Sequence, residues 1–452
     1  MKHVFTLLLL FVCASLAALA GSYTVGGSGA NFATLTDAIN ALNSQGLTNH
    51  TEFILSPGTY NGPFVMQHQS NGYDLTVHSG TAPSGSVILN NPSADGTNNY
   101  IVKIDNVSNV KLHKLSFVSS GNYNVAVQIN GNADYTGITS CRFQGQSNAS
   151  SNNSGAVYIT ASGNGDADYL YIALNSFYDG GYHIVCNSSS YNDSFADWQI
   201  LNNYFESGYN AINLLRFTGL KIMDNSIQGI THGINLASGN GSLEISGNMI
   251  SGCENGIYGN YLEVNTSIPH IYNNIVSVTG SYGMSIYGIG LNIMHNSISN
   301  SSANTYNTFA GALSGNSMQI RKNHFVATGG AIALSASSVD PLYPQRNIVE
   351  HNNLYSYGLY VAKIGNDNYR ELSDFAAVTQ TQNVSINPFF SSDLLSSVSP
   401  ALDNMYPSTA VTTDYNGLPR NPVNSDIGAH EYTHDPALSP MSGNYYIGAG
   451  EA

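Results

Sequence analysis

Two sets of polar residues recur at fixed distances before an asparagine, and they include groups that could exchange protons. Lys221, Glu244 and His270 each stand four residues before such an asparagine. The set one residue before it is Asp224, Gly247, Asn273, His295, Lys322 and His351. An amine close to a carboxylate can supply a base and an acid. We therefore predict Lys221, Glu244, Asp224 and the nearby Arg216 as catalytic candidates, and His270, His295, Lys322 and His351 as substrate-binding candidates.

The same two rows have a structural interpretation. Stacked strands place equivalent positions of successive repeats side by side, so outward polar residues form cross-strand pairs with or without chemistry. The sequence alone leaves both interpretations open.

The asparagines themselves mark a repeat. They stand 22 to 29 residues apart, at Asn175, Asn203, Asn225, Asn248, Asn274, Asn296, Asn323 and Asn352. Apolar residues alternate around each of them, as in LKIMDNSI at 220–227, which is typical of β-strands, and a period in the twenties indicates a solenoid. An inward asparagine at a bend can hydrogen-bond the equivalent asparagine about 4.8 Å away in the next coil. We predict an asparagine ladder with a structural role.

These patterns predict an all-β fold, a right-handed single-stranded parallel β-helix with an N-terminal helical cap and a C-terminal capping segment. In the cap helix, Thr34 and Asp37 form a capping pair and Leu35, Ile39 and Leu42 an apolar stripe. The expected divisions are a signal peptide at 1–20, a cap strand and helix at 21–50, the β-helix at 51–400, a C-terminal cap at 401–432, and a linker that could begin a second module at 433–452.

The N-terminal segment and the composition limit the location and the partners that we expect for the protein. The chain opens with a basic residue, an apolar run and a small-residue cleavage site, so we expect a secreted or extracellular-surface protein, and no later run is apolar enough to span a membrane. The formal net charge of −15 disfavours nucleic acid. Past the signal, Cys141, Cys186 and Cys253 do not form a disulfide framework. We expect a monomer.

The two ends of the predicted rod carry a family resemblance. DYNGLPRNPVNSDIGAHEY at 414–432 resembles the closing segment of secreted bacterial right-handed β-helix proteins of the pectin-lyase-like superfamily, and residues 23–46 resemble their opening segment. The resemblance covers residues 22–432 and implies the fold, with Asp414, Arg420, Asp426 and Glu431 as a charge network that closes the rod. That fold hosts lyases, hydrolases, esterases and binding proteins, so the resemblance implies no single activity.

Motifs for particular chemistries are missing or misplaced. The chain has no Asp-Asp pair for polygalacturonase-like hydrolysis and no Arg-x-Lys. Residues 430–434, HEYTH, have the letters of a zinc-protease motif, but in a strand the two histidines would lie about 13 Å apart, too far to share a zinc ion. We predict no metal site and no certain cofactor; calcium could bridge acidic groups.

Two functions fit these observations. Thirty tyrosines with 9% charged residues favour contact with sugar rings. The first hypothesis is therefore a secreted or cell-surface β-helix that engages polysaccharide, a cell-surface glycan or another surface partner without catalysis. The alternative is a polysaccharide-degrading enzyme, a lyase before a glycoside hydrolase, that uses the catalytic candidates named above.

Overall fold

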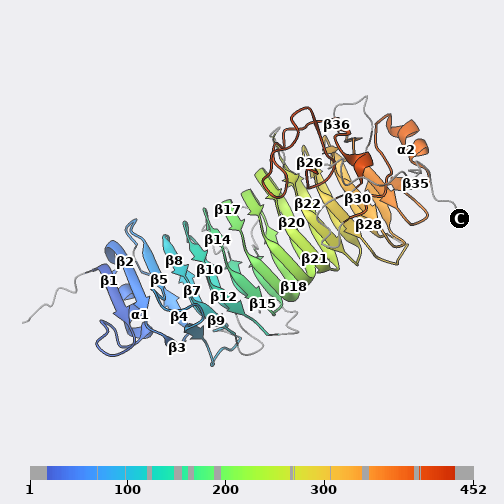
Figure 1. The fold of residues 1–452 in the computed structure, drawn as a ribbon. Helices are drawn as coiled ribbons and strands as arrows, with labels where there is room; N and C mark the ends of the chain where they lie inside the picture. The colour runs from blue at the N-terminus through green and yellow to red at the C-terminus, as the bar shows by residue number, and fades with distance from the viewer. Residues whose placement is uncertain are drawn as a thin grey trace, which may run out of the picture.

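The computed structural model is a parallel β-helix, as predicted (Figure 1). It describes residues 18–432 apart from 69, 97, 120–124, 147–154, 161–166, 188–194, 265–267, 269, 306, 338, 340–345, 391–396 and 398. Residues 1–17 of the predicted signal and the predicted linker at 433–452 lie outside the described residues.

Three strand columns form the faces of the rod. The first face precedes the ladder asparagines and contains β1 (Leu19–Val25), β2 (Leu47–Leu55), β5 (Leu75–His78), β8 (Val110–His113), β11 (Gly137–Thr139), β14 (Tyr171–Ala173), β17 (Phe195–Leu201), β19 (Phe217–Met223), the end of β20 (Ser226–Ser246), β23 (Ile271–Tyr272), β26 (Asn292–Met294), β29 (Gln319–Arg321) and β32 (Ile348–Glu350).

The second face follows the asparagines. It contains β3 (Gly58–Asn61), β6 (Val87–Asn90), β9 (Ser116–Val118), β12 (Arg142–Gln144), β15 (Ser176–Tyr178), the start of β18 (Tyr204–Leu215), the start of β20, β21 (Met249–Cys253), β24 (Ile275–Val278), β27 (Ser297–Asn300), β30 (His324–Ala327) and β33 (Asn353–Ser356).

The third face closes each coil. It contains β4 (Phe64–Met66), β7 (Tyr100–Asp105), β10 (Val125–Asn130), β13 (Gly155–Thr160), β16 (Tyr182–Cys186), the end of β18, the middle of β20, β22 (Asn255–Glu263), β25 (Tyr282–Ile289), β28 (Phe309–Asn316), β31 (Ile332–Ala336) and β34 (Ala362–Ile364), which pairs antiparallel with β35 (Asp367–Tyr369).

The asparagine ladder is confirmed. The backbone N–H and side-chain amide of each ladder asparagine both donate to the Oδ1 of the next one, at 2.9–3.1 Å. The ladder starts at Cys141, whose N–H donates to Asn175, and continues past Asn352 to Asn383, which the sequence did not reveal. Buried polar groups are thereby satisfied along the rod.

The bend before each ladder asparagine requires a left-handed backbone. The residue at this place has φ between 53° and 64° in Asp224, Gly247, Asn273, His295, Lys322 and His351. These residues lie on a turn and not on a strand. The repeated turn is therefore the first reason why these residues recur at the same place in each coil.

An apolar column fills the core beside the ladder. Phe117, Phe143, Phe177 and Phe205 stack with ring centroids 4.7–4.9 Å apart and planes within 6°. Aligned positions of later coils continue the column with aliphatic residues and Phe325. Cys141, Cys186 and Cys253 are buried, and none of the three forms a disulfide.

Helices cover both ends of the rod (Figure 1). At the N-terminal end, α1 (Leu35–Gln45) begins with the Thr34–Asp37 capping pair and buries Leu35, Ile39 and Leu42. At the C-terminal end lies α2 (Leu372–Thr379). Neither helix of the described residues has the length and apolar character needed to cross a bilayer.

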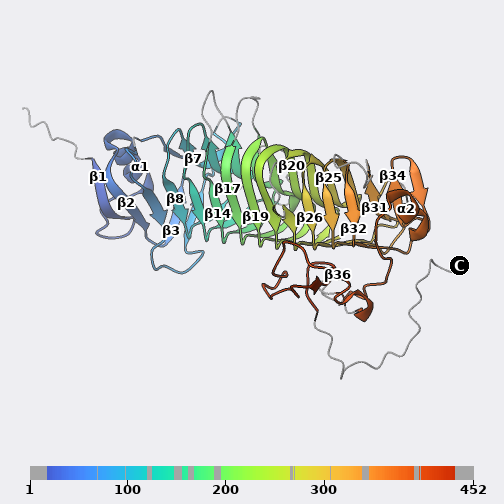
Figure 2. The same cartoon turned by 90° about the horizontal axis from the view of Figure 1, so that it is seen from above.

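The last described segment lies along the side of the rod (Figure 2). We call residues 401–432 the clasp. It contains β36 (Tyr406–Pro407) and β37 (Asn424–Ser425), and the 3-10 turn η1 (Pro400–Leu402) leads into it. The predicted cap therefore does not lie across the rod's end, because its polar contacts reach Asn273, Ser297 and Lys322 on the flank.

Candidate functional site

Three of the predicted site residues form a charged cluster together with Tyr272. Lys221 and Glu244 are register partners on β19 and β20, and Lys221 Nζ lies 3.3 Å from a Glu244 carboxylate oxygen. The Tyr272 hydroxyl donates to the other Glu244 oxygen. Burial and then Glu244 raise the pKa of Asp224, while burial and the Glu244 hydrogen bond raise the pKa of Tyr272 to about 12.

The cluster holds protons more readily than it removes them. In the ion pair with Glu244, the Lys221 ammonium has no lone pair to accept a proton. Arg216 stands at the bend before β19 and Asp224 at the bend after it. Between Arg216 and Lys221 the chain bends again at Gly219, whose φ is 93°. The structure thus brings together Lys221, Glu244 and Asp224 but not Arg216.

The predicted binding residues lie under the clasp or within the core. His270 is buried, and its Nδ1 accepts the Asn292 N–H at 2.9 Å. His295 is buried with its Nε2 2.9 Å from Thr409 Oγ1, and buried Lys322 donates to the carbonyls of Tyr406 and Ser425. His351 stacks on Tyr406 with ring centroids 4.2 Å apart. His270, His295 and Lys322 therefore have no exposed surface that a substrate could contact.

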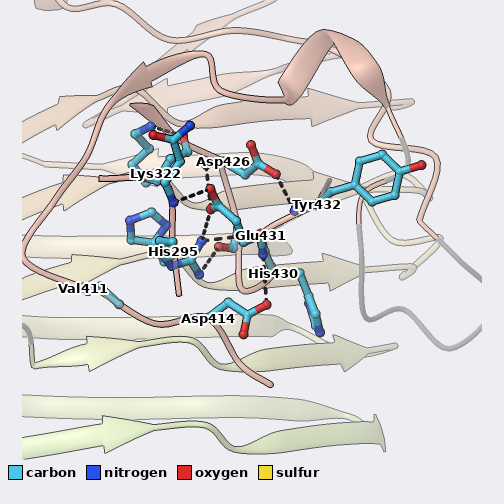
Figure 3. Close-up of polar contacts among 12 residues, drawn as sticks. His295, Lys322, Val411, Asp414, Asp426, His430, Glu431 and Tyr432 are labelled. Atoms are coloured by element: carbon cyan, nitrogen blue, oxygen red, sulfur yellow. Dashed lines mark hydrogen bonds and ion pairs between the residues drawn. The ribbon is translucent and has the colours of Figure 1, made fainter. Parts of the chain in front are cut away.

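The charged residues of the clasp form a buried network (Figure 3). Arg420 donates to Glu431 at 3.2 Å and to Asn273 Oδ1 at 2.9 Å, and to the carbonyls of Gly428 and Ala429. Asp414 accepts the Glu431 N–H, and Asp426 accepts the Tyr432 N–H. Arg420 thus fixes the clasp to Asn273 on the flank, while Asp414, Asp426 and Glu431 hold parts of the clasp to one another.

Buried histidines make the folded state sensitive to acid. Burial lowers the pKa of His324 to about 3, and burial followed by the Arg420 and Lys322 charges takes the pKa of His295 well below its usual value. Between pH 6.5 and such a folded pKa the unfolded chain binds more protons than the folded chain. The free energy of unfolding then falls by about 1.4 kcal/mol for each such histidine and each pH unit of acidification.

We expect a lower urea midpoint at pH 5 than at pH 7. His68 and His183, whose pKa values burial lowers to about 4, add to the effect of His295 and His324. Asp426 and Asp224 oppose it, because burial raises their pKa values, that of Asp426 to about 7. Urea unfolding followed by circular dichroism at both pH values measures the two midpoints. The variant Asp426→Asn removes an opposing group, so it should increase the difference between the midpoints. An equal or higher midpoint at pH 5 contradicts the prediction.

A groove of about 390 Å³ crosses the third face. Its thirteen lining residues are four tyrosines, four asparagines, one histidine, two isoleucines, a glycine and a serine: Tyr182, Tyr209, Asn210, Asn213, His232, Ile234, Asn235, Asn255, Gly256, Ile257, Tyr258, Ser281 and Tyr282. None of them is Asp, Glu, Lys or Arg. Burial lowers the pKa of His232, so its ring is neutral at pH 7 and the groove carries no charge.

Contacts between neighbouring coils order the groove side chains. Tyr209 meets Tyr182 edge to face at 5.7 Å and His232 at 5.0 Å. The Asn235 amide donates to Asn213 Oδ1 at 3.1 Å, and the Asn255 amide lies 3.2 Å from His232 Nδ1. The result is a surface of aromatic rings and amides, suited to flat molecules rich in hydroxyl groups.

The sequence contained a signal for this groove. Tyr182, Asn210, His232 and Asn255 are aligned in successive coils, at the start of the third-face strands. A polar or aromatic residue recurs there, but the strand pattern does not show that the surface is hollow.

Comparisons with known proteins show no family for this chain. No protein-family model matches it, and no curated protein matches it. Among solved structures, a GH136 lacto-N-biosidase from Eubacterium ramulus is similar, with a TM-score of 0.45 and 10% identity over 77% of this chain and 68% of that one. This similarity says nothing about the activity of this chain.

Proposed function

We propose that this protein is a β-helix that binds polysaccharide through the third-face groove without cleaving it. The lining of the groove carries the proposal. Tyr209 and Tyr258 are more than one-third exposed, so their rings can contact the apolar faces of sugars, and the asparagine amides can donate to and accept from hydroxyl groups. Secretion or surface attachment fits such a role and is part of the proposal.

The same lining argues against chemistry in the groove. Hydrolysis of a glycosidic bond ordinarily needs two carboxyl groups, and elimination needs a base; the groove lining has no carboxyl group and no lysine or arginine. Within the described part of the chain, no group of three or more His, Cys, Asp or Glu side chains could hold a metal ion.

The charged cluster supports an alternative function, polysaccharide cleavage. Glu244, Asp224 and Tyr272 come from different coils, and burial raises the pKa of Asp224, which suits a proton donor. In that case the cluster would act on a chain lying over the first face, away from the groove.

One experiment separates the two functions. We expect Tyr209→Ala to weaken binding in a polysaccharide panel about tenfold to a hundredfold, because it removes an aromatic contact worth about 1.5–3 kcal/mol. Tyr135→Ala is the matched control, since Tyr135 stands at a coil bend, is exposed and does not line the groove. The double variant Lys221→Ala, Glu244→Ala should bind normally.

Release of new chain ends is measured on the same panel. If the unmodified protein releases chain ends and the folded double variant does not, the alternative function is established. If Tyr209→Ala and Tyr135→Ala weaken binding equally, the groove is not the binding site.

A further inference from the structure

Charge selects among the polysaccharides that could enter the groove. The chain has a formal net charge of −15, and the groove lining offers no lysine or arginine. The nearest acidic influence is Glu254, whose charge acts on His232. A uronic acid or sulfated sugar would lose its hydration here without gaining a cationic partner, and the field of the protein would repel it. An uncharged sugar has neither cost.

The shape of the groove sets the direction of the bound chain. Its lining comes from five successive coils, represented by Tyr182, Asn210, His232, Asn255 and Tyr282. Four strand spacings amount to about 19 Å along the rod axis. Across the groove, the three residue steps from Asn210 to Asn213 cover about 10 Å. An extended chain therefore fits better along the axis than across it.

Amide groups in the groove can pair with hydroxyl groups. Asn213, Asn235 and Asn255 line the groove and are partly exposed. Each amide offers a donor and an acceptor, and a sugar hydroxyl can pair with both. A carboxylate has no hydrogen to give to the acceptor, so it can use only the donor.

From these three observations we infer that the ligand is an uncharged polysaccharide whose chain lies along the rod axis over the five coils of the groove. The inference rests on the proposed function and specifies its substrate class. It assigns Asn213, Asn235 and Asn255 as hydrogen-bonding groups for the sugar and the tyrosines as its stacking surfaces.

Calorimetric titration with oligosaccharides of increasing length tests the inference. We use neutral gluco-, xylo- and galacto-oligosaccharides and, for comparison, oligogalacturonates of the same lengths, at physiological ionic strength. The expected result is that one neutral series binds at least about tenfold more tightly than the acidic series. Its affinity should rise with length and level off once the chain spans the groove. His232→Lys should reduce this preference by improving acidic binding.

The outcomes separate the inference from the proposed function. Equal or tighter binding of the acidic series, weakened by Tyr209→Ala but not by Tyr135→Ala, overturns the inference and keeps the proposed function. If a single sugar unit binds as tightly as the longer oligosaccharides, the axial arrangement is overturned. Failure of the folded protein to bind any oligosaccharide or polymer of either class overturns both.

Discussion

Replacing Asn274 with alanine should lower the free energy of unfolding by about 3–5 kcal/mol. The Asn274 side chain is buried in the middle of the ladder. Its Oδ1 accepts from the backbone and the side-chain amide of Asn248, and its amide donates to Ile245, Tyr272 and Asn296. Alanine leaves several of these buried groups without partners, at about 1–3 kcal/mol for each.

Guanidinium unfolding measures this loss. Asn366→Ala is the control, because Asn366 is exposed and its replacement should change stability by less than about 0.5 kcal/mol. Asn274→Asp keeps the size and the acceptor but removes the donor, so it should also be strongly destabilising. A loss below about 1 kcal/mol for Asn274→Ala would show that the ladder contributes little to stability.

Replacing Arg420 with alanine should release the clasp while leaving the rod folded. Arg420 is buried, and it joins Glu431 of the clasp to Asn273 of the rod. Removing one member of a buried ion pair costs about 3–5 kcal/mol, because the other charge stays buried without its partner. Arg420→Lys should rescue little, since a single ammonium group cannot reproduce the forked contacts.

Hydrogen exchange resolved by segment measures this release. Amides of residues 401–432 should exchange much faster in Arg420→Ala, while those of the ladder strands keep their protection. Arg370→Ala, a change at an exposed arginine outside the clasp, should leave the exchange pattern unchanged. Loss of protection along the whole rod would instead make the clasp essential to the rod's folding.

The fold could be predicted because its determinants are local and repeated. Strand alternation around each asparagine and the spacing of 22 to 29 residues suffice for a parallel β-helix. Asn383 was missed because β34, β35 and α2 lie between it and Asn352, 31 residues earlier, and interrupt the pattern.

The candidate sites were harder to predict because they depend on contacts between distant segments. The spacing correctly paired Lys221 with Glu244, which are neighbours in register. It also suggested outward side chains at His295 and Lys322. Both instead lie on left-handed bends and are covered by a segment about 80 to 110 residues later in the chain. A strand pattern contains no information about such a covering segment, nor about the curvature that makes the groove concave.

The one-way order of the ladder bonds has an evolutionary consequence. In the bonds between asparagines, each one donates to the asparagine of the coil after it and accepts from that of the coil before it, with the same geometry throughout. The ladder bonds are therefore the same between any two neighbouring coils. Duplication or deletion of one complete repeat leaves every amide paired, whereas loss of part of a repeat does not. Such a rod can lengthen or shorten in whole steps of about 4.8 Å, and its binding surface can be resized without redesigning its core.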